Sequence, residues 1–155
     1  MYVPLKPSLL DNLIDDAPEA ITEQPVSYSL QALKNSVRRD IELLLNSRRS
    51  WLTWSKRLTE LDVSVMNYGL PDFSSMPFSS SDGRSYLCRI VEEAITRFEP
   101  RFDAVYVSVL EEGSPEDRVL RLRIQAIFRV GTEQEELVFD SEVEPVSLGI
   151  KVEES

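Results

Sequence analysis

The spacing of the apolar residues changes at Pro100, and this change constrains the fold more than any other feature. Before Pro100, apolar residues recur at intervals of three and four, which is typical of helices with one buried face. After it, apolar and polar residues alternate, most regularly from Leu120 to Val130. Such alternation predicts strands with one buried face. Helices first and strands afterwards predict an α+β fold, in which two main helices pack on a mostly antiparallel sheet.

Two long helices are expected before Pro100. The first begins near Ser27 or Ser29, either of which suits an N-cap, and runs to about Asn46. The second follows the stretch 81–83 and ends at the proline, because the residue before a proline is forced out of the α conformation. Apolar stripes on both helices should face the sheet: Leu30, Leu33, Val37, Ile41, Leu44 and Leu45 on the first, and Leu87, Ile90, Val91, Ala94, Ile95 and Phe98 on the second.

Two segments lack a clear period. Residues 1–26 contain four prolines and a cluster of acids, which predicts an N-terminal arm preceding a single domain of residues 27–155. Within the arm, residues 8–15 suit a short helix that would need a surface to lie on. Trp51 and Trp54 begin a run with helical spacing, but the stretch after Asn67 cannot continue a helix. Such a long loop is often functional, although the sequence assigns no role to the Trp51–Trp54 segment.

The charge distribution narrows the class of partner. The chain of 155 residues carries a formal charge of −10, which opposes general binding to nucleic acids or anionic membranes. Residues 26–60 are the exception, with seven basic and three acidic side chains, so an acidic partner would dock there. No apolar run approaches the ~20 residues of a membrane-spanning helix. We therefore expect a soluble, cytoplasmic protein without direct membrane insertion.

The composition removes much of enzyme chemistry. The chain has no histidine, and Cys88 is its only cysteine, so common nucleophile pairs, metal sites and an internal disulfide are not expected. No phosphate- or cofactor-binding motif is present, and we expect no cofactor. A glycosidase would need two carboxyl groups, for which Glu99 and Asp103 are the nearest candidates. Arg101 between them would lower a carboxyl pKa, which is the wrong direction for a general acid.

The triplet Glu99-Pro100-Arg101 allows two interpretations. It is either a helix end with an incidental surface ion pair, or a rigid display in which Arg101 offers its planar fork to another chain. The residues alone leave both open. The same choice, between a solvated face and a docking surface, applies to the arginines of the first helix and its end: Arg38, Arg39, Arg48 and Arg49.

Five stretches occur in one order along the chain and together are specific. They are SLLDNL at 8–13, VRRDIELLLNSRR at 37–49, YGLPDF at 68–73, LCRIVEEAITRFEPRF at 87–102 and LRLRIQA at 120–126. With these stretches, the chain resembles the TssE family of baseplate components of bacterial type VI secretion systems. Through it, the chain is similar to the lysozyme-like wedge proteins of contractile phage baseplates.

The resemblance implies a non-catalytic subunit in a cytoplasmic baseplate docked at the inner membrane. Implied partners are the TssF and TssG wedge proteins, the TssB/TssC sheath whose assembly it helps to initiate, and other baseplate subunits such as TssK and the VgrG hub. The alternatives are a muramidase-like glycoside hydrolase and an adaptor for an unrelated regulator. The resemblance places the docking motif on Glu99, Pro100 and Arg101, with further partner contacts at or near Arg48, Arg49, Tyr68, Gly69 and Asp72.

An unpaired sheet edge offers another way to bind the sheath. Pairing through the main chain adds strands with little dependence on side chains, which suits a protein that starts a polymer. The last alternating run, Val146 to Val152, or an adjacent edge strand is the predicted location.

Overall fold

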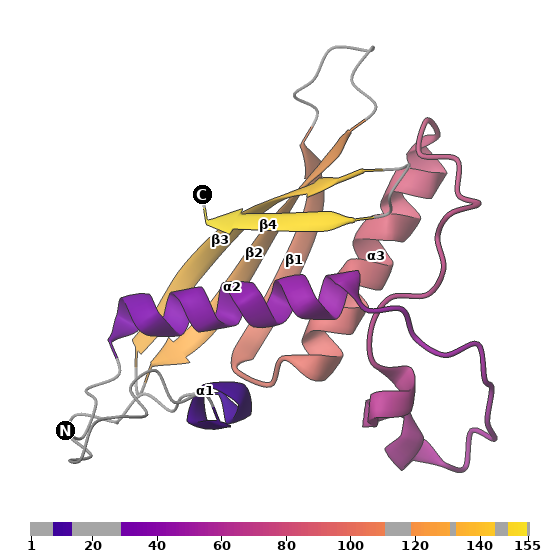
Figure 1. The fold of residues 1–155 in the computed structure, drawn as a ribbon. Helices are drawn as coiled ribbons and strands as arrows, with labels where there is room; N and C mark the ends of the chain where they lie inside the picture. Colours follow the sequence, from indigo (N-terminus) through magenta and orange to yellow (C-terminus); the bar gives the residue numbers. More distant parts are fainter. Residues whose placement is uncertain (1–7, 14–28, 111–118, 131–132, 145–148, 155) are drawn as a thin grey trace.

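A computed structural model describes residues 8–13, 29–110, 119–130, 133–144 and 149–154 (Figure 1). The two long helices precede the four strands, which confirms the α+β fold class. In chain order the elements are α1 (Leu9–Leu13), α2 (Leu30–Asn46), the 3₁₀ turns η1 (Thr59–Val63) and η2 (Val65–Asn67), α3 (Ser81–Phe98), β1 (Phe102–Leu110), β2 (Leu120–Val130), β3 (Glu133–Val143) and β4 (Ile150–Glu154).

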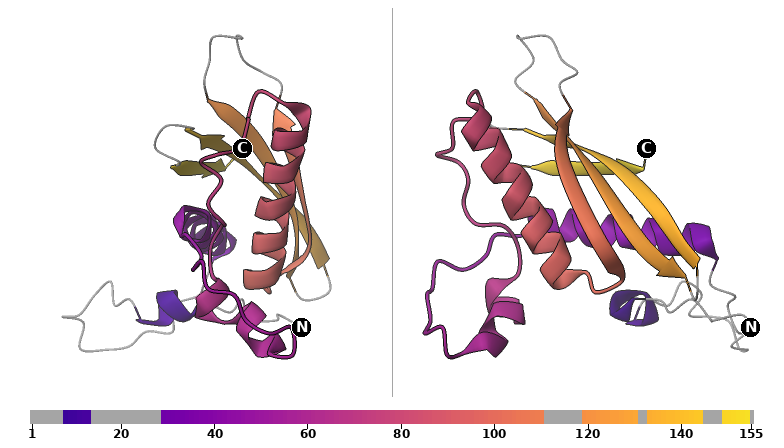
Figure 2. Two further views of the ribbon diagram at one scale, coloured as in Figure 1. Left: turned by 90° about the vertical axis from the view of Figure 1, so that its right-hand side faces the viewer. Right: turned by 180° about the vertical axis from the view of Figure 1, so that it is seen from behind.

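The four strands form one antiparallel sheet in the order β1-β2-β3-β4. Both long helices lie on the same face of this sheet, with α2 toward β4 and α3 along β1 (Figures 1 and 2). Successive strands are neighbours, so every sheet connection is a direct return. None of the helices among the described residues is long and apolar enough to cross a membrane.

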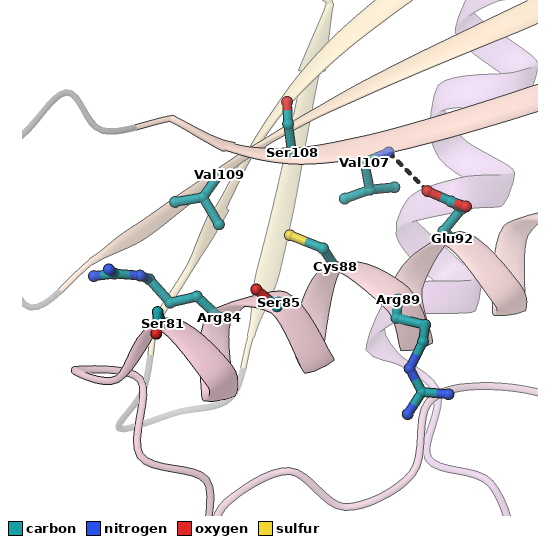
Figure 3. Close-up of a pocket in the computed structure, with 9 residues that line it drawn as sticks. All are labelled: Ser81, Arg84, Ser85, Cys88, Arg89, Glu92, Val107, Ser108 and Val109. Atoms are coloured by element: carbon teal, nitrogen blue, oxygen red, sulfur yellow. Dashed lines mark hydrogen bonds between the residues drawn. The ribbon is translucent and has the colours of Figure 1, made fainter.

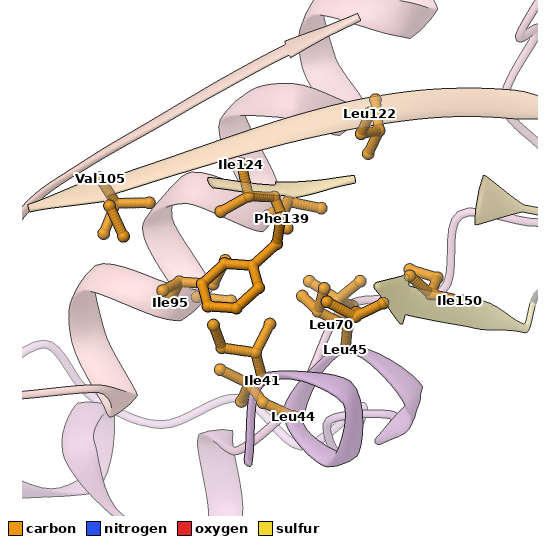
Figure 4. Packing of buried hydrophobic residues seen from close by; sticks show 14 of the residues in the cluster. Ile41, Leu44, Leu45, Leu70, Ile95, Val105, Leu122, Ile124, Phe139 and Ile150 are labelled. Atoms are coloured by element: carbon orange, nitrogen blue, oxygen red, sulfur yellow. The ribbon is translucent and has the colours of Figure 1, made fainter. Parts of the chain in front are cut away.

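The hydrophobic core lies between the sheet and the two long helices. Ile124 and Phe139 are paired on β2 and β3 and point inward, where Ile41 of α2 and Ile95 of α3 meet them (Figure 4). Alternate residues from Leu122 to Phe128 are buried and the residues between them are half-buried. This pattern confirms the prediction of a strand with one buried face.

Serine side chains fix where the long helices begin. Of the two expected N-caps for α2, Ser29 serves, because its hydroxyl accepts a hydrogen bond from the Ala32 N–H at 3.1 Å. The helix α3 begins at Ser81, earlier than expected, since Ser80 caps it by accepting from the Gly83 N–H at 3.0 Å. Gly83 therefore lies inside the first turn, where a Cβ would meet the Pro77 carbonyl oxygen at 2.3 Å.

The apolar spacing that begins at Trp51 and Trp54 does not produce an α-helix. Residues 50–58 belong to no helix or strand, and the two 3₁₀ turns η1 and η2 follow. Trp51 is 89% exposed, so the apolar spacing finds no surface against which a helix could pack.

The described part of the N-terminal arm forms the short helix α1. Its surface is α2, which it contacts through polar groups: Ser36 donates to Asp11 at 2.5 Å, and Arg39 pairs with Asp11 at 2.7 Å. Leu10 and Leu13 remain 39% and 74% exposed.

Side chains of α2 cover the outer edge of β4. Asn46 donates to the Ile150 carbonyl at 2.7 Å and accepts from its N–H at 3.0 Å, and Arg38 donates to the Val152 carbonyl at 3.2 Å. The predicted final strand thus begins at Ile150, and residues 145–148 lie outside the described part of the chain. Because these edge groups already have partners, β4 is a poor template for another strand.

Candidate docking site

The turn from α3 into β1, residues 98–102, forms a tight corner. The Glu99 N–H donates to the Ile95 carbonyl at 2.8 Å, and the Phe102 N–H donates to the Glu99 carbonyl at 3.3 Å. Glu99 has left the helical conformation, with φ −116° and ψ 83°, as Pro100 requires. The sequence therefore places an acidic and a basic side chain on a short segment held at both ends.

Glu99 and Arg101 form a two-point ion pair with each other. The Arg101 Nε donates to Glu99 Oε1 at 2.6 Å, and Nη2 donates to Oε2 at 2.5 Å. The Arg101 backbone N–H also donates to Oε1, at 3.3 Å. The Glu99 side chain is only 8% exposed and that of Arg101 18%. The pair is neither an incidental surface contact nor a fork free to meet another chain.

A third member of the cluster comes from α2. The Arg101 Nη2 donates to Asp40 Oδ2 at 2.8 Å, and Asp40 also binds Arg39 Nη2 at 3.0 Å. Through the pairing of Arg39 with Asp11, the chain of charges reaches α1. One network thus ties the arm, the first long helix and the corner together, and we call Glu99, Arg101 and Asp40 the corner cluster.

The charges of the corner cluster keep Arg101 protonated. Burial alone would lower the pKa of its guanidinium, but the hydrogen bonds and charges of Glu99 and Asp40 outweigh that effect and raise the pKa well above its usual value. Among the described residues, Arg101 Nη1 is a buried nitrogen with no hydrogen-bond partner.

An apolar hollow of about 510 Å³ lies beside the corner cluster. Glu99 and Asp40 lie on its wall, and Tyr68 packs edge-on against Phe98 there with ring centroids 5.2 Å apart. Burial, then the nearby charges of Asp40 and Glu99, raise the pKa of Tyr68. Much of the remaining lining is leucine, including the 49% exposed Leu43. An apolar surface next to a rigid charged cluster suits a contact with another protein.

The predicted residues Arg48 and Gly69 belong to a different structure, the anchor of the 68–73 loop. Arg48 forms a parallel bridge with Leu70, and its guanidinium lies 4.7 Å from the centre of the Phe73 ring. Gly69 has φ +100°, and a Cβ there would lie 2.4 Å from the Ser47 carbonyl oxygen. Only glycine fits this approach, so the role of Gly69 is to close the loop onto the end of α2.

Arg49 and Asp72 are exposed at the same anchor. The Arg49 N–H donates to the Leu70 carbonyl at 3.0 Å, and Asp72 accepts from the Ser74 N–H at 2.9 Å. That hydrogen bond is the main reason why the pKa of Asp72 lies below its usual value. Of the residues predicted from the loop, only Tyr68 lines the hollow at the corner cluster.

The sequence placed Arg101 between Glu99 and Asp103, and this is wrong. Asp103 accepts instead from Gln134 of β3 at 3.4 Å, because the register shift between Phe102 and Ala104 breaks the simple alternation. The acid on the other side of Arg101 is Asp40. In the sequence, the only sign of this role for Asp40 is its place next to Ile41 of the apolar stripe. The sequence drew attention to this part of the helix for its arginines and not for Asp40.

A second hollow, of about 520 Å³, opens between α3 and the edge strand β1 (Figure 3). Glu92 crosses it to accept from the Val107 N–H at 3.2 Å, and Arg84 and Cys88 line it. Burial, then the charge of Glu92, raise the pKa of the Cys88 thiol. Across the described segments, no group of three metal-ligating side chains is close enough to hold an ion.

Comparison with models of protein families places these features in context. Residues 31–133 match the family described as baseplate wedge protein gp25. The chain belongs to this family. The matched region spans α2, the 68–73 loop, the corner cluster and β2, and TssE proteins are members of the same family. A search of curated proteins found no match. Membership implies a structural role in a baseplate and contact with other baseplate components.

Proposed function

We propose that the chain is a baseplate subunit of a type VI secretion system that docks on the TssF/TssG wedge through the corner cluster and the adjoining hollow. The observation that carries this proposal is the buried pair of Glu99 and Arg101, joined to Asp40 beside an open apolar surface. The baseplate would lie in the cytoplasm at the inner membrane, where TssK and the VgrG hub are further neighbours.

The geometry favours a supporting role for Arg101 rather than direct capture of a partner. Its Nε and Nη2 atoms already bind Glu99 and Asp40, and its Nη1 atom is buried, so Arg101 is not placed to bind a carboxylate of another chain. Their hydrogen bonds hold the corner in one conformation and thereby hold Phe98 in the wall of the hollow. A preorganised surface loses less entropy when it binds, which raises affinity without adding contacts.

We further propose that the protein acts without catalysis and without a cofactor. Both Glu99 oxygens accept hydrogen bonds from a guanidinium that stays charged, an arrangement suited to a structural carboxylate rather than a proton donor. A muramidase-like activity would clear a suspension of purified peptidoglycan. Clearing that disappears in a Glu99→Gln variant would refute the non-catalytic proposal.

We propose that the protein also helps to initiate the sheath, and that the sheath contact lies at β1 rather than β4. The β4 edge is occupied by Asn46 and Arg38, whereas β1 borders the open hollow in front of α3. Val109 has the same orientation as Val107, whose N–H points out of the sheet toward Glu92. A Val109→Pro variant should therefore bind the wedge but fail to start a TssB/TssC sheath. Normal sheath assembly by this variant would exclude the β1 edge.

The docking proposal is tested by co-purification with TssF and TssG from the same genome. Glu99→Ala, Arg101→Ala and the surface variant Leu43→Ser should bind more weakly than wild type. Arg121→Ala is a matched control, because it removes another arginine–glutamate pair, with Glu142, on the outer side of the sheet. All variants should first show native circular dichroism.

Each outcome decides the proposal. Loss of binding in the three corner variants, with retention in Arg121→Ala, supports docking at the corner. Equal binding by all of them would reduce the corner to a helix-to-strand joint and favour the adaptor alternative with another surface. Absence of binding by wild type would overturn the assignment to this baseplate.

A further inference from the structure

The segment of residues 50–66 carries an unusual concentration of exposed apolar side chains. It leaves the body of the domain after α2 and returns at the 68–73 loop, standing off to one side with the turns η1 and η2 (Figures 1 and 2). We call it the tryptophan excursion. Of the eleven large apolar residues exposed in the described part of the chain, six lie here: Trp51 at 89%, Leu52, Leu58, Val63, Val65 at 84% and Met66.

The tryptophan excursion is held in one shape despite its exposure. At its base, the Leu70 N–H donates to the Ser47 carbonyl at 2.9 Å. Inside it, the Trp54 Nε1 donates to an Asp62 carboxylate oxygen at 3.0 Å, and just beyond its end the Asn67 side-chain amide donates to the Asp62 carbonyl at 2.8 Å. The exposed apolar groups are therefore presented in advance of any contact, which is how a binding surface limits its entropy loss.

Cationic side chains accompany the apolar ones. Residues 48–57 contain four basic side chains, two tryptophans and no acid, and the two acids of the tryptophan excursion, Glu60 and Asp62, follow this stretch. Lys56 and Arg57 are exposed within the tryptophan excursion itself. Such a surface complements a protein cleft bordered by carboxylates. A bilayer is a poorer match, because the strongly negative whole would be repelled by anionic lipids.

The tryptophan excursion adjoins the hollow at the corner cluster. Tyr68, just beyond its end, packs on Phe98 and lines the hollow together with Glu99. One partner seated on the corner would therefore come close to the excursion. This continuity indicates that both surfaces serve the same partner.

We propose that the tryptophan excursion is a second contact of the wedge protein that docks at the corner, with Trp51 buried in an apolar cleft whose rim carboxylates pair with Lys56 and Arg57. The inference rests on the proposed function, since it takes the partner from there. It adds the chemistry of the partner surface, an apolar cleft with an acidic rim. Tryptophan is a frequent energetic centre of protein interfaces because it buries a large rigid area.

The test measures binding of wild-type and variant chains to a purified TssF–TssG complex from the same genome. Trp51→Ser should weaken binding by roughly tenfold or more. Its matched control is Tyr106→Ser, which removes an exposed aromatic ring of the sheet (59% exposed). Arg57→Glu should also weaken binding, whereas the control Lys151→Glu, on β4, should not. Wild-type binding should include charge pairs, which salt screens. Raising NaCl from about 0.1 M to about 0.5 M should therefore weaken the binding of wild type more than the binding of Arg57→Glu.

The result separates this inference from the proposed function. Weaker binding by both excursion variants, with unchanged controls, supports the inference. Wild-type affinity in Trp51→Ser, together with loss of binding in Arg101→Ala, would overturn the inference and leave the corner proposal standing. Failure of wild type to bind would overturn both. Flotation of wild type with anionic phosphatidylglycerol vesicles, lost in Trp51→Ser, would assign the excursion to lipid instead and so refute the protein contact.

Discussion

Replacing Arg101 with methionine should destabilise the fold strongly, because it leaves two carboxylates facing each other without their shared cation. Breaking a buried ion pair by removing one partner costs about 3–5 kcal/mol. The exposed fractions are 18% for Arg101, 8% for Glu99 and 20% for Asp40. Asp40 keeps its contact with Arg39 at 3.0 Å, so we expect a cost at the lower end of this range. We expect Arg101→Met to lower the free energy of unfolding by about 3 kcal/mol.

Urea denaturation followed by circular dichroism measures this free energy. Arg121→Met is the matched control, since its pair with Glu142 at 3.2 Å is 38% and 55% exposed, and such pairs contribute about 1 kcal/mol or less. The double variant Glu99→Gln/Arg101→Met should recover part of the loss, because the buried charge that lost its partner is then absent.

Two results would refute the reasoning. A loss for Arg101→Met no greater than for Arg121→Met would mean that the corner is not held by its charges. A double variant less stable than Arg101→Met would mean that an unpaired Glu99 carboxylate is not the source of the cost. Either result would also weaken the docking proposal, which depends on a rigid corner.

Three further predictions follow from other contacts. Gly69→Ala should lower the free energy of unfolding by several kcal/mol in the same assay, because φ is +100° and the new Cβ would lie 2.4 Å from the Ser47 carbonyl oxygen. A variant as stable as wild type would show that the loop shifts at little cost. The raised pKa of Tyr68 means that the unfolded chain loses this proton first, so stability should fall as pH rises from about 10 through the raised value. Tyr68→Phe should make that fall smaller and leave the part due to the Cys88 thiol, whose pKa is also raised, and an unchanged pH profile would contradict the assignment. Asn46→Ala uncovers both edge groups of Ile150 and should cost about 1–3 kcal/mol and promote association at high concentration, detected by light scattering.

The sequence by itself determined the fold class and the ends of several elements. Its apolar spacing marks α2 and α3, its alternation marks β2, and Pro100 ends the second long helix, because these features act on the backbone within a few residues. It also singled out Glu99 and Arg101, but whether they pair with each other or with another chain was decided only by the structure. It did not decide whether Ser27 or Ser29 caps α2, because the two serines lie within a single helical turn of each other.

The tertiary structure decided everything that depends on residues far apart in the chain. Asp40 joins Arg101 across 61 positions of sequence, and α2 covers the β4 edge through Asn46, 104 positions before Ile150. No local period encodes such contacts, since they arise only when helices and sheet pack together. The helical spacing that begins at Trp51 failed for the same reason: a stripe becomes a helix only where a surface buries it, and here the fold provides none.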